Sequence, residues 1–126
     1  MRQLALVMVL LAGTVAAQVD GVPRDLIEQR IEEAAERLGD DSDVDLNNLF
    51  EALTDRYLDP IDLNHTDAQE LSALFLLDDV QIVSLLQHIR RNGKLLSVYE
   101  LQTIPGWDAR TIQLIRPFVT VRENPM

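Results

Sequence analysis

The sequence predicts an all-α protein in which an acidic arm of two helices precedes two copies of a helical hairpin. Three observations lead to this prediction. Apolar residues recur at helical spacing along most of the chain, and an N-cap residue stands before most of these periodic runs. A segment also repeats itself after 30 residues. Glycine and proline number only five each in 126 residues, which argues against an all-β or disordered chain.

The first 17 residues predict a secretory signal peptide. Arg2 supplies a short positive region, and residues 4–12 form an apolar stretch too short to span a bilayer. Val15 and Ala17 are small residues placed for cleavage before Gln18. This order of features disfavours the alternative, a buried N-terminal helix. We therefore expect an exported protein of the periplasm or cell envelope, with no membrane span in the mature chain.

Composition excludes several classes of chemistry. The chain has no cysteine, which rules out a lipid-anchored cysteine, disulfides, zinc–thiolate sites and thiol catalysis. The net charge of −10 is unevenly spread. Residues 18–60 hold 4 basic and 13 acidic residues, whereas residues 61–122 hold 6 and 7. The charge argument against a polyanionic partner therefore applies mainly to the arm, residues 18–60.

The arm contains two amphipathic helical patterns. The first follows Pro23 and ends at Gly39, which predicts a C-cap. Its expected inward residues are Ile27, Ile31, Ala34, Ala35 and Leu38. The second pattern covers residues 46–58 and stops at Pro60. Its expected inward residues are Leu46, Leu49, Phe50, Leu53 and Tyr57 or Leu58.

The acidic linker between these helices resembles a calcium-binding loop only superficially. Asp41, Asp43 and Asp45 alternate as EF-hand ligands do. However, the positions that require glycine and glutamate are Leu46 and Ala52. We therefore predict a solvated linker in which Asp45 caps the second helix, and no metal site.

The internal repeat aligns residues 70–86 with residues 100–116 without a gap. The identical pairs are Glu70/Glu100, Leu71/Leu101, Asp78/Asp108 and Ile82/Ile112. The pairs alike in kind are Leu74/Ile104, Leu77/Trp107 and Leu85/Ile115. Two unrelated amphipathic segments can match by chance. We favour duplication because in both copies the aligned acid directly follows a large apolar residue.

Each copy is predicted to form a short helix, a tight corner and a longer helix. The predicted N-caps with their capping-box partners are Asp67 with Glu70, Asp78 with Gln81, and Ser97 with Glu100; Asp108 caps the last helix. Gly93 and Pro117 are expected to end the two longer helices. The predicted core of this region is Leu71, Leu74, Leu77, Ile82, Leu85, Leu86, Ile89, Leu101, Ile104, Trp107, Ile112, Ile115 and Phe118.

Three stretches carry a resemblance to a known family: "IDLNHTDAQEL" (61–71), "HIRRNGKLLSVYEL" (88–101) and "IPGWDARTI" (104–112). Residues 61–120 resemble the tandem helix-hairpin-helix module of the late-competence DNA receptor (ComEA-like) family. The chain also looks like the N-terminal part of larger exported Bacteroidetes proteins. On that resemblance, residues 121–126 are a tail at which a longer protein is truncated.

The resemblance implies sequence-independent binding of duplex DNA, through backbone N–H groups of a Gly-apolar-Gly hairpin at a helix N-terminus. Gly106, Trp107 and Arg110 are the candidate phosphate-binding residues. Yet both copies depart from that hairpin pattern, since Asp78 and Asp108 replace the second glycine. Each aspartate places a negative charge where the phosphate would lie. We therefore expect internal helix caps in place of an anion site.

A cluster of basic residues supports the alternative interpretation, in which the protein binds DNA. His88, Arg90, Arg91 and Lys94 lie close together and form a candidate patch that follows a nucleic-acid backbone. The alternative is a helix C-terminus whose cations complement its dipole, with His88 facing solvent. We favour this alternative because the cluster lacks interleaved aromatic residues.

No set of residues in the sequence supports catalysis. The two histidines lack metal-ligand spacing, and no glycine-rich nucleotide loop occurs. We expect a non-enzymatic protein without cofactor, metal or small-molecule substrate. Its expected role is that of a structural or protein-interaction module whose partner is another envelope protein. Duplex DNA binding is the alternative.

Overall fold

The computed structural model describes residues 21–39 and 43–122. Of these described residues 67% are helical, and four α-helices have seven or more residues. The predicted signal peptide, the middle of the acidic linker and the end of the tail lie outside the described residues. No helix among the described residues is both long and apolar enough to cross a membrane.

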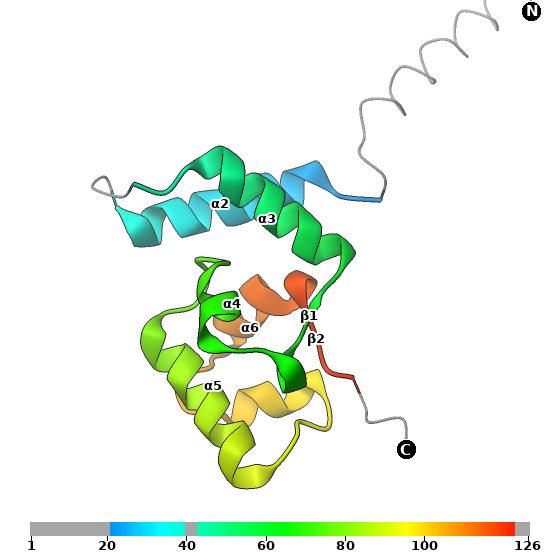
Figure 1. Ribbon diagram of the computed structural model, residues 1–126. Helices are drawn as coiled ribbons and strands as arrows, with labels where there is room; N and C mark the ends of the chain where they lie inside the picture. Colours follow the sequence, from blue (N-terminus) through cyan, green and yellow to red (C-terminus); the bar gives the residue numbers. More distant parts are fainter. Residues whose placement is uncertain (1–20, 40–42, 123–126) are drawn as a thin grey trace, which may run out of the picture.

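The arm forms two helices that lie side by side (Figure 1). Helix α2 (Arg24–Leu38) starts after Pro23 and ends at Gly39, whose φ of +74° favours glycine. Helix α3 (Leu46–Leu58) is capped by Asp45, whose carboxylate accepts a hydrogen bond from the Asn47 N–H at 2.9 Å. The first and last residues of both helices agree with the boundaries predicted from the sequence.

The first hairpin comprises β1 (Ile61–Asp62), the 3₁₀ helix η1 (Leu63–His65), α4 (Ala68–Ser72) and α5 (Asp79–Asn92). The sequence pattern predicts that the short helix after Asp67 covers residues 68–76, which is wrong, because α4 stops after five residues. The chain then tightens into i→i+3 turns, and Phe75 adopts a φ of +56°. This corner turns Leu76 and Leu77 into the core, where a continued helix would leave part of them exposed.

The second hairpin comprises η2 (Val98–Thr103), α6 (Ala109–Ile115), η3 (Arg116–Phe118) and β2 (Val119–Thr120). Its first helix is a 3₁₀ helix, and Pro117 lies within η3, so the chain continues helically past the expected stop. Strands β1 and β2 pair in parallel, Ile61 with Val119 and Asp62 with Thr120. The all-α prediction is therefore corrected to a mostly helical fold with a two-stranded parallel sheet.

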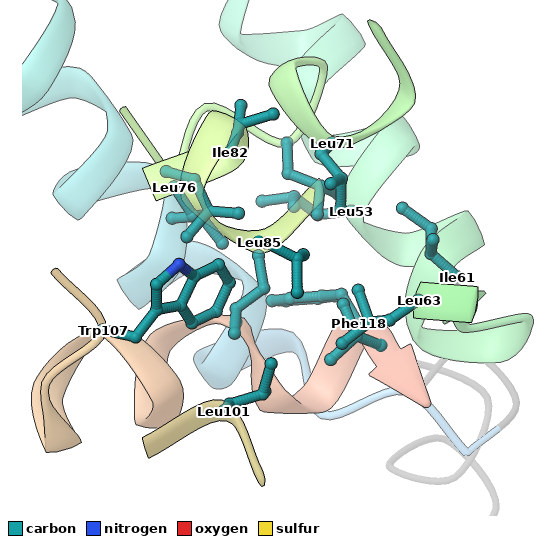
Figure 2. Close-up of a cluster of buried hydrophobic side chains, with 14 of the residues drawn as sticks. Leu53, Ile61, Leu63, Leu71, Leu76, Ile82, Leu85, Leu101, Trp107 and Phe118 are labelled. Carbon is teal, nitrogen blue, oxygen red and sulfur yellow. The ribbon is translucent and has the colours of Figure 1, made fainter. Parts of the chain in front are cut away.

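One hydrophobic core joins all of these elements (Figure 2). Ten of the thirteen predicted core residues are buried, and Leu86, Ile89 and Ile112 are partly buried against them. The expected inward position of Leu46 is wrong, since 46% of it is exposed. Of the alternatives Tyr57 and Leu58, Tyr57 packs against the core, while Leu58 is 57% exposed. Buried residues that the predicted core omitted are Ile61, Leu63, Leu76, Leu95, Leu114 and Val119.

Polar contacts hold the arm onto the second hairpin, in addition to packing of α3 against η3. The Arg30 guanidinium donates hydrogen bonds to the carbonyl oxygens of Leu114 (3.0 Å) and Gln113 (3.3 Å) near the end of α6. A cation at this end of a helix also complements the helix dipole. The arm therefore acts as the C-terminal cap of α6.

Candidate functional site

The two hairpin corners are linked by the side chain of Gln81. Its Nε2 donates to the Gly106 carbonyl at 3.1 Å and to the Thr111 hydroxyl at 3.0 Å. In return, the Trp107 indole N–H donates to the Gln81 carbonyl at 2.9 Å. Gln81 and Thr111 are the two buried polar residues of the described chain. They lie 30 residues apart, so the repeat places equivalent positions in direct contact.

Gln81 also completes the predicted capping box of α5. The Asp78 carboxylate accepts from the Gln81 N–H at 2.8 Å, and the Gln81 side-chain oxygen accepts from the Asp78 N–H at 3.0 Å. The sequence indicated the capping role of Gln81 but not its contacts with the second hairpin. The signal was present, because the 30-residue shift aligns Gln81 with Thr111 at the same cap position.

Asp108 caps α6 as predicted, accepting from the Thr111 N–H at 2.8 Å. This hydrogen bond, followed by one from the Thr111 side chain, lowers the pKa of Asp108 below its ordinary value. Asp78, Asp79 and Asp108 are all exposed. The corners therefore present carboxylates to solvent at the position where a phosphate would need a positive helix end.

At the second corner Trp107 is directed inward, whereas Gly106 is exposed. Gly106 has a φ of +87°, and a Cβ built there would meet only the Gln81 Cγ at 3.9 Å. The glycine is therefore needed for backbone conformation and not for close approach. Trp107 is only 3% exposed, and its backbone N–H donates to the Ile104 carbonyl at 3.1 Å. The Trp107 ring packs in the core, as predicted (Figure 2), and a role of Trp107 in phosphate binding stays a prediction.

Arg110, the candidate phosphate-binding cation, is paired within the chain. Its Nη2 lies 2.9 Å from both carboxylate oxygens of Glu33 in α2. These residues are 77 positions apart, so the sequence alone did not reveal the pair. The acidic arm therefore offsets the charge that the hairpin would need for an anion.

The four residues of the candidate basic patch do not share one environment in the structure, because His88 is largely buried and the other three are exposed. Arg90, Arg91 and Lys94 are exposed, and no carboxylate of the described residues forms an ion pair with them. The expectation that His88 faces solvent is wrong, because its side chain is 15% exposed and bonded to Glu100 at 2.8 Å. The remaining cations lie at the C-terminal end of α5. They are about 18 Å along the helix from Asp78, at ~1.5 Å per residue.

Glu100 joins α5 to η2. One carboxylate oxygen accepts from the Leu96 N–H at 3.0 Å, and the other contacts His88 Nε2. The Leu96 N–H is the main cause that lowers the pKa of Glu100, followed by the hydrogen bond with His88. The predicted capping box with Ser97 is therefore half wrong. Ser97 accepts from the Tyr99 N–H at 3.2 Å, but Glu100 does not return to the Ser97 N–H.

The capping box expected at Asp67 is incomplete in the same way. Asp67 accepts from the Glu70 N–H at 2.8 Å. The Glu70 carboxylate instead accepts from the Thr66 hydroxyl (2.6 Å) and from Arg56 of α3 (3.1 Å). In both hairpins the glutamate thus reaches a group outside its own helix.

Among the described residues, no group of three or more potential metal-ligating side chains is close enough to hold a metal ion.

Two surface grooves follow the same repeat. The groove between α4 and α5 is lined by Ala68, Gln69, Ser72, Asp79, Ile82 and Val83. Each of these residues, shifted by 30, lines the groove between η2 and α6: Val98, Tyr99, Gln102, Ala109, Ile112 and Gln113. The second groove has a volume of about 440 Å³ against about 290 Å³ for the first. Trp107, Asp108 and Arg116 also line it.

Fold and site together define a small, mostly helical protein with a two-stranded parallel sheet, in which hydrogen bonds of Gln81 link the corner before α5 to the corner before α6. Comparison of the chain with protein-family models, with curated proteins and with solved structures finds no match.

Proposed function

We propose that the chain is a non-enzymatic, exported module of helix-hairpin-helix type that acts as a structural or protein-interaction domain of the cell envelope. The observation that carries the proposal is the closed pair of corners. Gln81 ties the two corners together, and Asp78 and Asp108 occupy the helix N-termini. Export is inferred from residues 1–17 and forms part of the proposal.

The electrostatics of the corners also disfavour a DNA-binding role. A non-specific DNA-binding surface gains its affinity from unpaired cations that meet phosphates. Here the cation nearest the second corner, Arg110, is paired with Glu33, and exposed carboxylates flank both corners. Asp78 and Asp108 cap the two helices, and their negative charges would repel a phosphate at these corners.

Duplex DNA binding is the second candidate function, and one observation favours it. Arg90, Arg91 and Lys94 are exposed cations without an acidic partner among the described residues. They could track a phosphate backbone independently of the corners. Such binding would use the C-terminal end of α5, where the helix dipole already favours cations.

Fluorescence anisotropy of a labelled duplex, titrated with the whole chain from low to physiological salt, tests the proposal. We expect no binding at micromolar protein, even at low salt. The whole chain is required because the arm contributes to the core and caps α6. Salt-dependent binding by the wild type that is lost in Arg90→Ala/Arg91→Ala would overturn the proposal in favour of DNA capture.

The variant Asp108→Gly serves as a matched probe of the second corner. Glycine is nearly as good an N-cap as aspartate, so the fold should tolerate the change at a cost of a few tenths of a kcal/mol. We expect this variant to remain without DNA affinity, because Arg110 is still held by Glu33 and the Gly106 carbonyl by Gln81. Strong binding by Asp108→Gly in the DNA titration would mean that the corner is a latent phosphate site, contrary to the proposal.

A further inference from the structure

The second groove differs from the first in ways that suit a ligand. Relative to the first groove, Gln69 is replaced by Tyr99, and the acidic Asp79 by Ala109. The groove also gains a cation, since Arg116 stands where the first copy has Leu86. The second groove is thus larger in volume and gains an aromatic side chain and a cation, while each groove is lined by one carboxylate, Asp79 in the first and Asp108 in the second.

Two exposed residues at the rim of the groove, Tyr99 and Arg116, contact each other. Tyr99 is 65% exposed, although it is a large aromatic side chain. The Arg116 guanidinium lies over its ring, 5.5 Å from the centroid. No carboxylate of the described residues forms an ion pair with Arg116. An aromatic ring and a cation that are ordered together but remain solvated are typical of a contact surface.

Charges of opposite sign stand at the two ends of α6 along this groove. Asp108 lies at the helix start, and hydrogen bonds from Thr111 keep its pKa low, so it remains ionised at neutral pH. Arg116 directly follows the last residue of the helix. They are eight positions apart in the sequence, which is about 12 Å along the helix at ~1.5 Å per residue. The rest of the lining combines the apolar side chains of Val98, Trp107, Ala109 and Ile112 with the polar side chains of Tyr99, Gln102 and Gln113.

We propose that the groove between η2 and α6 binds an extended segment of a partner protein in which a basic, an apolar and an acidic residue occupy alternate positions. In an extended chain, residues i, i+2 and i+4 share one face and span about 13 Å at ~3.3 Å per residue. This length matches the distance from Asp108 to Arg116. The basic residue meets Asp108, the apolar residue enters the groove, and the acidic residue meets Arg116. This inference rests on the proposed function and specifies the partner's recognition segment.

Trp107 provides the signal for a direct test, because it is the single tryptophan of the chain and lines the groove. The probe is the capped peptide acetyl-Lys-Ser-Phe-Ser-Glu-amide, titrated into the whole chain at low salt while tryptophan emission is recorded. We expect a saturable change in emission. A peptide with the same composition but the order Lys-Phe-Ser-Ser-Glu should bind several-fold more weakly, because its phenylalanine falls on the opposite face.

Substitutions assign the contacts. Arg116→Gln should weaken binding about threefold to fivefold, the effect of one solvent-exposed ion pair. It should have no effect on a peptide in which glutamine replaces the glutamate. Tyr99→Ala should weaken binding by about fivefold or more, since aromatic residues dominate such contacts. The matched controls are Arg90→Gln, another unpaired arginine, and Gln69→Ala, the counterpart of Tyr99 in the first groove; neither should change the affinity.

The outcomes separate this inference from the proposed function. Emission that stays constant up to millimolar peptide, or equal losses in the control variants, would overturn the groove assignment alone. Salt-dependent duplex binding in the anisotropy titration would overturn the proposed function, whatever the peptide result. Saturable peptide binding lost in Arg116→Gln and Tyr99→Ala, but retained in the two controls, supports the inference.

Discussion

At the residue scale, Gln81 has a role that no other side chain of the described structure shares. Its amide oxygen serves the cap of its own helix, while its amide nitrogen binds the corner and the cap residue of the other hairpin. A buried polar network stabilises only when its members are satisfied, and it then favours one relative placement of the parts. Gln81 therefore specifies how the two hairpins dock.

Replacement of Gln81 by leucine should destabilise the protein by about 2–3 kcal/mol. The change would leave the Gly106 carbonyl, the Thr111 hydroxyl and the Asp78 N–H without their partner, and unsatisfied buried groups carry costs of this size. Urea unfolding followed by tryptophan fluorescence measures the effect. The control is Gln87→Leu, at an exposed position of the same helix, which should change stability by less than about 0.5 kcal/mol. Similar effects of the two variants would refute the role assigned to Gln81.

At the element scale, the contact between α5 and η2 depends on one carboxylate. Glu100 binds the Leu96 N–H ahead of its own helix and His88 across the interface. Both groups favour the ionised form, which is why the pKa of Glu100 is lowered. The hydrogen bonds to Glu100 therefore contribute more stability while this side chain is charged than when it is protonated.

This contact predicts a pH dependence of stability. Because the pKa is lower in the folded state, the contribution of Glu100 is fully present above its ordinary value of 4.5 and is lost as the pH falls through the lower folded value. The difference in unfolding free energy between wild type and Glu100→Gln should therefore be constant at neutral pH and shrink in acid. Urea unfolding at a series of pH values measures it. Glu51→Gln, at an exposed position of α3, is the control, and an identical acid profile for both variants would contradict the prediction.

Much of the element pattern was predictable because it is local. The N-caps Asp45, Asp67, Asp78, Ser97 and Asp108 all accept a hydrogen bond from an N–H two or three residues ahead, so the sequence itself contains donor and acceptor. The capping-box predictions failed where a residue distant in the sequence binds the glutamate in place of the N-cap N–H. Glu70 reaches Arg56 and Glu100 reaches His88, so neither returns to its own N-cap. The length of α4 also depended on a tertiary effect, the burial of the corner leucines.

The candidate site was predictable to the same limited degree. The caps at both corners and the inward position of the apolar residue before each aspartate follow from the repeat. The pair of Arg110 with Glu33 and the bonds from Gln81 to the second corner join segments 25 to 77 residues apart. Such contacts depend on how the elements dock, which periodicity and capping patterns do not encode.

At the scale of the whole molecule, the core continues from the arm into the hairpins. Leu53 of α3 and Phe118 of η3 are fully buried in the same cluster (Figure 2). Arg30 and Glu33 of α2 add polar contacts to α6. We therefore expect the described chain to unfold as one cooperative unit.

The variant Leu53→Ala tests this cooperativity. Loss of a fully buried leucine should cost about 2–5 kcal/mol. Far-UV circular dichroism reports on all helices, whereas fluorescence reports on Trp107 in the second hairpin, and both transitions should shift together. Leu58→Ala, on the exposed side of the same helix, should have little effect. A fluorescence transition that stays in place while the dichroism transition moves would mean that the arm unfolds separately.

The parallel pair of β1 and β2 has a topological consequence. Ile61 pairs with Val119 and Asp62 with Thr120, so the segment that enters the double hairpin lies beside the segment that leaves it (Figure 1). The chain between Ile61 and Thr120 is therefore a closed loop, and β1 and β2 must separate before its two ends can move apart. The arm joins the chain at one of these ends, so the chain enters and leaves the double hairpin at the same place.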